Sequence, residues 1–211
     1  HPNMVEALDL LSTPDHWCLV LEYLPAGDMF SLIVDAPETL TPREVARLFA
    51  ELAMAVGYMH RKHVVHGDLK IENVLFTANR RTLKVTDFGL ATWCPPGQRL
   101  TARCGSEEYV APEVIQGLAY EGPPIDVWAL GVILFALLTK ELPFVTRPGE
   151  RTRAMFHRIA RAEYKWPAGV AVDPLAKDLV GLILVPFPSR RATIPQILAH
   201  PFLAPPDPFV Q

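Results

Sequence analysis

The sequence is poor in several features that mark particular classes of protein. Its 211 residues contain three cysteines, Cys18, Cys94 and Cys104, which lie far apart and lack the spacing of metal ligands. An odd, sparse count excludes a disulfide framework and favours a reducing, intracellular compartment, the cytoplasm or the nucleus. The 20 basic and 23 acidic residues leave a net charge of −3, which argues against a nucleic-acid-binding surface.

Long apolar runs and internal repeats are also absent. The longest run, Val127 to Leu138, is shorter than the about 20 residues that a helix needs to cross a bilayer, so it predicts a buried helix and no membrane contact. Apolar side chains nevertheless make up 50% of the chain, an ordinary share for a globular protein. A chain of this length can bury a sizeable core.

The pattern of apolar and turn residues predicts an α+β fold that is mainly helical. Two short apolar runs around Ser12-Thr13-Pro14-Asp15 predict a β-hairpin, Met4–Leu11 and Trp17–Tyr23. A capping box at Thr41–Glu44 opens an amphipathic helix that continues to Met59. Further along, we expect short strands at 64–65, 74–76 and 83–85, a loop from 97 to 124, and helices near 126–139, 150–161, 174–185 and 193–199.

One constellation carries the chemistry. His66-Gly67-Asp68-Leu69-Lys70-Ile71-Glu72-Asn73 is followed by Asp87-Phe88-Gly89 and then by Ala111-Pro112-Glu113. With these motifs in this order, the chain resembles the eukaryotic protein kinases, whose signature has a catalytic loop, a DFG and an APE. The resemblance extends from His1 to about Leu203 and includes Asp126–Gly131. It implies a kinase C-lobe, residues 25–211, behind a β-hairpin and hinge of the N-lobe, residues 1–24.

The resemblance assigns catalytic and metal-binding roles to four residues. Asp68 would orient the substrate hydroxyl and accept its proton. Asn73 and Asp87 offer the oxygen ligands that Mg²⁺ prefers, and the phosphates of ATP would complete its coordination. Lys70, two residues after Asp68, would reach the transferred phosphate and is similar to the lysine of Ser/Thr kinases. The expected reaction is therefore transfer of the γ-phosphate of Mg-ATP to Ser or Thr of a protein substrate.

The same resemblance maps a site for adenine. Residues 19–24 look like the strand that leads into the kinase hinge. Main-chain groups of Glu22 and Leu24 would bind the adenine edge, Leu21 would take the gatekeeper position, and Leu75 would form the apolar floor. An ordinary buried strand predicts much the same residues.

Other kinase-like residues are expected to be structural. His66 should pack beneath the DFG, and Asp126 should accept hydrogen bonds from the backbone of the catalytic loop. Glu113 and Arg191 should form a buried ion pair that ties the APE segment to the late helices.

The sequence departs from the kinase pattern in two ways. Gly67 stands where most kinases have an arginine, which usually pairs with a phosphorylated residue; Thr101, in the segment from Thr92 to Arg103, would lack that partner. Before the hinge, the sequence contains no Gly-x-Gly-x-x-Gly loop. It also lacks the strand lysine that contacts the phosphates in kinases and the glutamate that pairs with this lysine. Either the chain is a fragment of a complete kinase or its gene lacks the N-lobe. We expect little activity from the chain alone.

Two finer expectations remain. Cys104–Tyr109 and Leu142-Pro143-Phe144 look most like the calmodulin-dependent and AMP-activated branch of Ser/Thr kinases. Asp28 and Glu72 would favour Arg or Lys upstream of the phosphoacceptor, unless both are merely solvated acids. The rival interpretation of the whole chain is a pseudokinase, a kinase-shaped interaction module without catalysis. The oligomeric state is left open.

Overall fold

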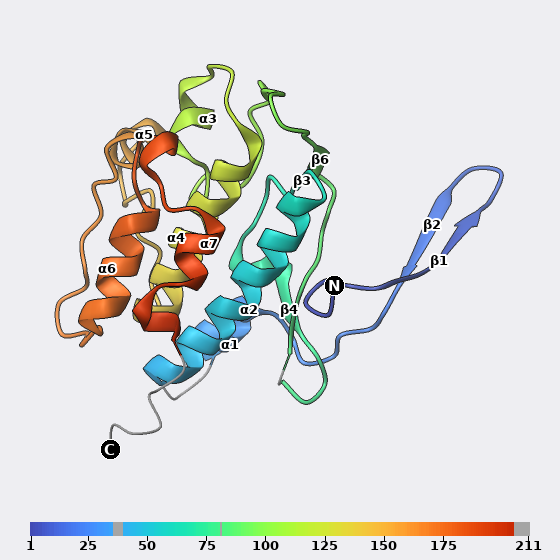
Figure 1. Ribbon diagram of the computed structural model, residues 1–211, viewed down its shortest axis with the longest axis horizontal. Coiled ribbons are helices and arrows are strands. Elements are labelled where there is room, and N and C mark those ends of the chain that lie inside the picture. Colours follow the sequence, from blue (N-terminus) through green and yellow to red (C-terminus); the bar gives the residue numbers. More distant parts are fainter. Residues whose placement is uncertain (36–39, 81, 205–211) are drawn as a thin grey trace.

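The protein is described here by a computed structural model that covers residues 1–35, 40–80 and 82–204 (Figure 1). Within these ranges it is an α+β structure that is mostly helical. The α-helices are α1 Met29–Asp35, α2 Pro42–Arg61, α3 Pro112–Gln116, α4 Gly122–Thr139, α5 Thr152–Arg161, α6 Pro174–Ile183 and α7 Ile194–Leu198. Short 3-10 turns lie at η1 Ile71–Asn73, η2 Pro188–Arg190 and η3 Pro201–Leu203.

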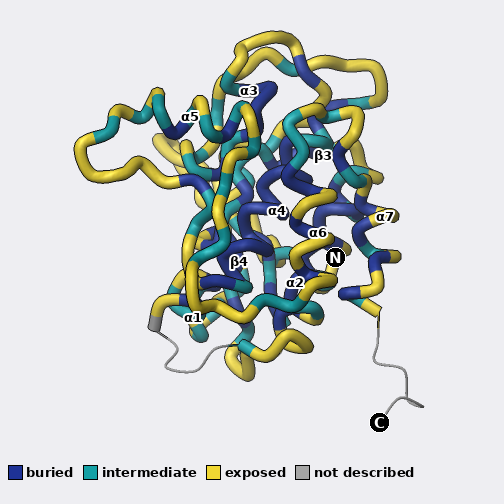
Figure 2. Tube along the Cα trace, turned by 90° about the vertical axis from the view of Figure 1, so that its left-hand side faces the viewer, coloured by how far each residue is buried: buried dark blue, intermediate teal, exposed yellow. Residues whose placement is uncertain are grey.

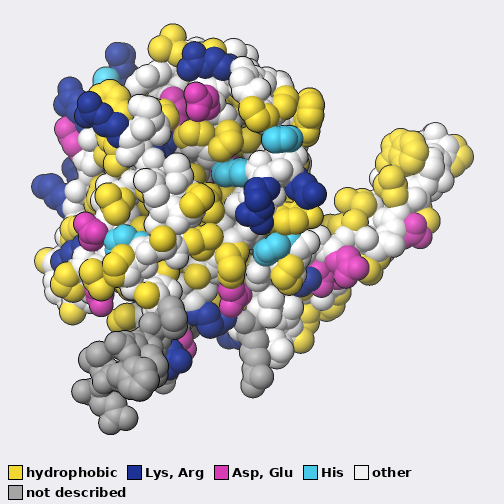
Figure 3. All heavy atoms as spheres, in the orientation of Figure 1, with side chains coloured by type: hydrophobic (Ala, Val, Ile, Leu, Met, Phe, Trp, Pro, Cys, Tyr) yellow, Lys and Arg dark blue, Asp and Glu magenta, His cyan; other side chains and the backbone are white. Residues whose placement is uncertain are grey.

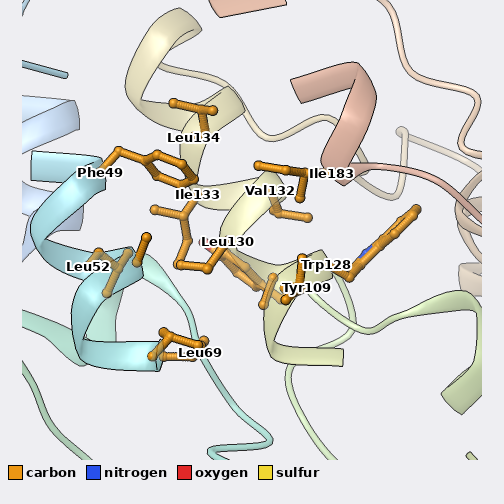
Figure 4. Packing of buried hydrophobic residues seen from close by; sticks show 14 of the residues in the cluster. Phe49, Leu52, Leu69, Tyr109, Trp128, Leu130, Val132, Ile133, Leu134 and Ile183 are labelled. Carbon is orange, nitrogen blue, oxygen red and sulfur yellow. The ribbon is translucent and has the colours of Figure 1, made fainter. Parts of the chain in front are cut away.

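The core is organised around α4, which is buried along nearly its whole length (Figure 2). Phe49 and Leu52 of α2 lie beside Leu130 and Ile133 of α4, and Ile183 of α6 lies on another side (Figure 4). By length and composition α4 would suffice to cross a membrane, but 83% of it is buried inside the protein. It is therefore the buried helix that the apolar run predicts. The helix begins four residues before the predicted start at 126, with Gly122, Pro123 and Pro124 in its first turn.

Local signals account for the boundaries of α2 and α7. The Thr41 hydroxyl accepts from the Glu44 amide at 3.2 Å, and the Glu44 carboxylate accepts from the Thr41 amide at 2.8 Å. Thr193 and Gln196 form the same reciprocal box before α7. Each box satisfies N–H groups that have no partner within the helix. The predicted capping box at Thr41–Glu44 is thus confirmed.

Six short strands form three antiparallel pairs in the part of the chain that the structure describes. The strands are β1 Ala7–Ser12, β2 Trp17–Leu21, β3 Val64–Val65, β4 Val74–Phe76, β5 Leu83–Val85 and β6 Thr92–Trp93, paired as β1–β2, β3–β6 and β4–β5. The predicted strands 64–65, 74–76 and 83–85 are confirmed with these bounds. A parallel bridge between Met4 and Val85 fastens the start of the chain to the β4–β5 pair.

The β1–β2 hairpin projects away from the helical body (Figure 1). The predicted hairpin is present, with Leu10 paired with Leu19 and Ser12 paired with Trp17, although Ser12 was expected in the turn. Every residue of both strands is exposed, and Trp17 retains 74% of its accessible surface. Figure 3 shows apolar side chains along its visible face. Neither face of this two-stranded sheet packs on the described body.

One expectation about local structure is wrong, and two short elements were missed. The predicted loop 97–124 contains α3 and the first residues of α4, because Pro112 and Pro123 each stand in a first helical turn, where a missing N–H costs nothing. The short helix α1 and strand β6 were not predicted. Both are too short to display a period, and β6 exists through its pairing with β3.

Candidate active site

A buried carboxylate on α4 shapes the loop that follows β3. Asp126 accepts hydrogen bonds from the backbone amides of His66 at 2.9 Å and Gly67 at 3.0 Å. Its Oδ2 also lies 2.9 Å from Nε2 of His60 on α2. These contacts bind the loop to the core helix and confirm the structural role predicted for Asp126. The partner His60 was not predicted, because only folding brings α2 and α4 together.

The carboxylate of Asp68 is held from two directions. Lys70 Nζ donates to Oδ2 at 2.9 Å, and the amide and hydroxyl of Ser106 donate to Oδ1 at 2.8 and 2.9 Å. Burial alone would raise the pKa of Asp68, but these bonds outweigh burial and leave the pKa below its ordinary value. The bond to Asp68 in turn raises the pKa of Lys70. The site therefore presents an ionised carboxylate beside an ammonium group.

Ser106 is a member of this cluster that the sequence did not single out. It lies in the segment 87–113, where Gly105 has a φ of +100° and a Cβ would come 2.8 Å from the carbonyl oxygen of Gly67. Only glycine permits this close approach between the segment and the loop. The signal that could have revealed it is the Gly-Ser step shortly before Ala111-Pro112-Glu113.

Asn73 and Asp87 are the two oxygen-bearing side chains that were predicted to bind a metal. Asn73 is buried, and its Nδ2 donates to the carbonyl oxygen of Asp68 at 2.9 Å, which turns the amide oxygen away from that bond. Asp87 is exposed and has a φ of +62°. No cluster of three or more His, Cys, Asp or Glu side chains suited to a metal occurs in the described residues. Any cation here would thus rely on these two residues and on ligands from outside the chain.

Neighbouring structural contacts agree with the predictions. The rings of His66 and Phe88 lie 5.2 Å apart, and Nε2 of His66 lies 3.0 Å from the carbonyl oxygen of Thr86. Glu113 and Arg191 form a buried bidentate ion pair at 2.8 and 3.0 Å. Both predicted arrangements, His66 beneath the DFG and the Glu113–Arg191 pair, are therefore present.

Comparison with known proteins decides the family. The family model described as the protein kinase domain matches residues 1–203. This chain belongs to the protein kinase family. The predicted resemblance is thus confirmed over nearly the whole chain.

The relatives of this kinase chain are protein kinases, several of them described as serine/threonine-protein kinases. It is 38% identical over 203 residues to the mitosis inducer protein kinase cdr1 of Schizosaccharomyces pombe, covering 96% of the chain and 33% of that protein. It is 39% identical over 208 residues to the SNF-related serine/threonine-protein kinase of Homo sapiens, covering 99% of the chain and 26% of that protein. The probable serine/threonine-protein kinase KCC4 of Saccharomyces cerevisiae is 39% identical over 203 residues, which are 96% of the chain and 19% of that protein. The chain spans about a third or less of these relatives.

In this kinase chain the residues predicted to contact adenine lie near the β4–β5 pair. The carboxylate of Glu22 accepts from Lys84 Nζ on β5 and, at 2.8 Å, from the amide of Glu6. Leu24 and Leu75 are half-buried, whereas Leu21 at the end of β2 is 40% exposed. Within the described residues, the hairpin side of this region is open. Leu75 thus lies half-buried on β4, whereas Leu21 at the end of the exposed hairpin is only partly covered by the described residues.

The position of Gly67 has a backbone reason to be glycine. Its φ is +76°, and a Cβ would lie 3.2 Å from the carbonyl oxygen of Leu90. A pocket of about 270 Å³ opens beside it, with Arg99, Thr101 and Tyr120 in its lining. A side chain at position 67 would therefore be strained by this backbone conformation and would crowd the Leu90 carbonyl oxygen.

Proposed function

We propose that this chain carries the catalytic machinery of a serine/threonine protein kinase, which transfers the γ-phosphate of ATP to a hydroxyl of a protein substrate. The observation that carries the proposal is the clamp on Asp68, formed by Lys70 on one oxygen and Ser106 on the other. A solvated loop carboxylate would need no such clamp. Membership of the kinase family supports the reaction class.

In this reaction Asp68 orients the substrate hydroxyl and accepts its proton. Its lowered pKa keeps the carboxylate ionised at neutral pH, so it is ready to accept a hydrogen bond. Lys70, which is hydrogen-bonded to Asp68, places a positive charge beside the group being transferred. Phosphoryl transfer depends mainly on such positioning and charge neutralisation.

The donors near Asp68 fit a magnesium nucleotide. The amide oxygen of Asn73 and the carboxylate of Asp87 are hard oxygen ligands of the kind Mg²⁺ prefers. When bound, the metal ion neutralises charge on the phosphates. The backbone of Glu22 and Leu24 would hold the adenine edge, with Leu21 and Leu75 against the ring. We further propose that residues 1–24 are strands and hinge of the N-lobe and that residues 25–211 are the C-lobe.

A rival function is a kinase-shaped interaction module without turnover. The observation in its favour is the β1–β2 hairpin, whose apolar side chains are exposed on both faces. Against it stands the satisfied hydrogen-bond network around Asp68, which binding alone does not require. Because Cys18, Cys94 and Cys104 are all free, we keep a cytoplasmic or nuclear location as part of the proposal.

The test measures phosphate transfer from labelled ATP to a generic basic protein, using the natural full-length protein. Asp68→Asn should reduce the rate by about a hundredfold or more, since a positioned base contributes about 10²–10⁴-fold. Asp15→Asn, the same change in the exposed hairpin turn, should leave the rate unchanged. Equal rates for Asp68→Asn and wild type, or no transfer by wild type together with normal folding, would favour the interaction module.

A further inference from the structure

A second pocket, of about 530 Å³, lies apart from the Asp68 cluster on another side of the core. It opens between the C-terminal end of α2, the first turn of α4, and α7. Its walls are mostly apolar and include Pro124, Val127, Ile194, Pro195 and Leu198. A pocket of this size suits a small molecule, since such sites occupy about 300–1,000 Å³.

Local sequence explains the shape and the mostly apolar character of the pocket walls. Gly57 on α2 has no side chain, which lets Ile194 of α7 approach closely, because a Cβ there would meet Cγ2 of Ile194 at 2.9 Å. Pro124 and Pro195 stand in the first turns of their helices and have no N–H to donate. The walls therefore present carbon surface with few hydrogen-bond donors, which favours an apolar ligand body.

The basic side chains that line this pocket are His60, Arg61 and Arg191, and within the described residues only Arg61 has no partner. His60 is held by Asp126, and the Arg191 guanidinium is satisfied by Glu113 and by the carbonyl oxygens of Val185 and Pro124. Arg61 is exposed, with Nη1 3.5 Å from the Cβ position of Gly57, and no partner for it exists among the described residues. Among the residues that the structure describes, no acidic side chain lines the pocket. Basic and histidine side chains lie beside apolar ones near the end of α2 in Figure 3.

We propose that this pocket binds a small amphiphile with an apolar body and a single carboxylate, which pairs with Arg61. One unpaired guanidinium matches one carboxylate in charge and in the planar geometry of a bidentate contact. A phosphate monoester carries a charge near −2 at neutral pH. Arg61 would neutralise only one of these charges, and the other would lie against an apolar wall. The ligand would touch His60 and Arg191 but none of the residues assigned to phosphate transfer.

The test is calorimetric titration of the full chain with decanoate below its micelle concentration, compared with 1-decanol and decyl phosphate. Decanoate should bind to wild type more tightly than either analogue. Arg61→Gln should weaken decanoate about tenfold or more and leave decanol unchanged, because a charge-assisted bond is lost. Lys62→Gln removes the neighbouring cation, which lies over Tyr58 outside the pocket, and should change binding less than twofold.

A steric variant tests the location. Leu198→Trp would fill the pocket and should abolish binding while circular dichroism remains that of wild type. If that variant fails to fold, the exposed Arg61 and Lys62 variants decide the matter alone. Absence of decanoate binding, equal losses in the Arg61 and Lys62 variants, or tighter binding of decyl phosphate would overturn the proposal.

Discussion

Ser106 donates two hydrogen bonds to one oxygen of Asp68, from its amide at 2.8 Å and from its hydroxyl at 2.9 Å. The same hydroxyl lies 3.0 Å from Nζ of Lys70. Ser106 thus links the segment 87–113 to both side chains that we assign to phosphate transfer.

Replacing Ser106 should alter both the rate and its pH dependence. Ser106→Ala removes the hydroxyl bond and keeps the amide bond, so kcat should fall about tenfold, the effect of one hydrogen bond of roughly 1.4 kcal/mol. In the proposed reaction Asp68 acts ionised, so we expect activity to be lost as pH falls through its pKa. Because the hydroxyl lowers that pKa, its removal should move the acid limb to higher pH.

The measurement is kcat/KM against pH for wild type, Ser106→Ala and Ser106→Thr, in the full-length protein. Threonine keeps the hydroxyl and should restore both the rate and the wild-type limb. An alanine variant with an unshifted limb would show that Ser106 acts only in folding.

The isolated 211-residue chain should bind Mg-ATP weakly and turn over negligibly. It contains no Gly-x-Gly-x-x-Gly loop, and both strands of the described hairpin are exposed. Ligand stabilisation equals RT ln(1 + [L]/Kd), so ATP near its Kd should raise Tm by only about 1–2 °C. Differential scanning fluorimetry with and without Mg²⁺ checks this, with Asp87→Asn as the control. A large Mg-dependent shift at micromolar ATP contradicts the prediction.

Thr101→Ala should leave the activity of the full-length protein nearly unchanged. Gly67 offers no side chain to a phosphate on Thr101, and the segment is already held by Tyr120. The Tyr120 backbone exchanges two hydrogen bonds with Leu100, and its hydroxyl donates to the carbonyl oxygen of Ala102 at 2.7 Å. Tyr120→Phe, which breaks the last bond, should slow transfer more than Thr101→Ala does. A hundredfold loss with Thr101→Ala would reveal another basic clamp.

Asp28 and Glu72 should favour Arg or Lys two to three residues before the phosphoacceptor. Glu72 is exposed, whereas Asp28 is half-buried and its Oδ1 accepts from the amide of Ser31 at 2.7 Å. Asp28→Asn is therefore the better variant, because Asn removes the charge and still caps α1. On a peptide array, Asp28→Asn with Glu72→Gln should lower the preference for upstream Arg about tenfold, or roughly 1.4 kcal/mol. Equal selection by variant and wild type would reject the assignment.

Breaking the Glu113–Arg191 pair should destabilise the protein strongly. Arg191→Met leaves a buried carboxylate without a partner and should cost about 3–5 kcal/mol in urea unfolding. Arg161→Met, which breaks the exposed pair with Glu163, should cost at most about 1 kcal/mol. The double variant Glu113→Leu with Arg191→Met should recover much of the loss, since no buried charge remains. Similar costs for the two single variants would show that burial of the pair is unimportant.

Much of the local structure was readable from the sequence alone. Thr41 and Thr193 each carry their capping partner three residues later, and the strands 64–65, 74–76 and 83–85 are bounded by turn residues. The ordered motifs at 66–73, 87–89 and 111–113 identified the family. Such signals depend on neighbours within a few residues, so they survive without knowledge of the fold.

Only the tertiary structure determined which residues from distant segments contact one another. His60 meets Asp126 across 66 positions and Ser106 meets Asp68 across 38, because α2 and the segment 87–113 pack against the same core around α4. The hairpin's exposure and the pocket near Arg61 likewise depend on which faces the helices cover. These contacts arise from packing between elements, which no pattern along a single segment encodes.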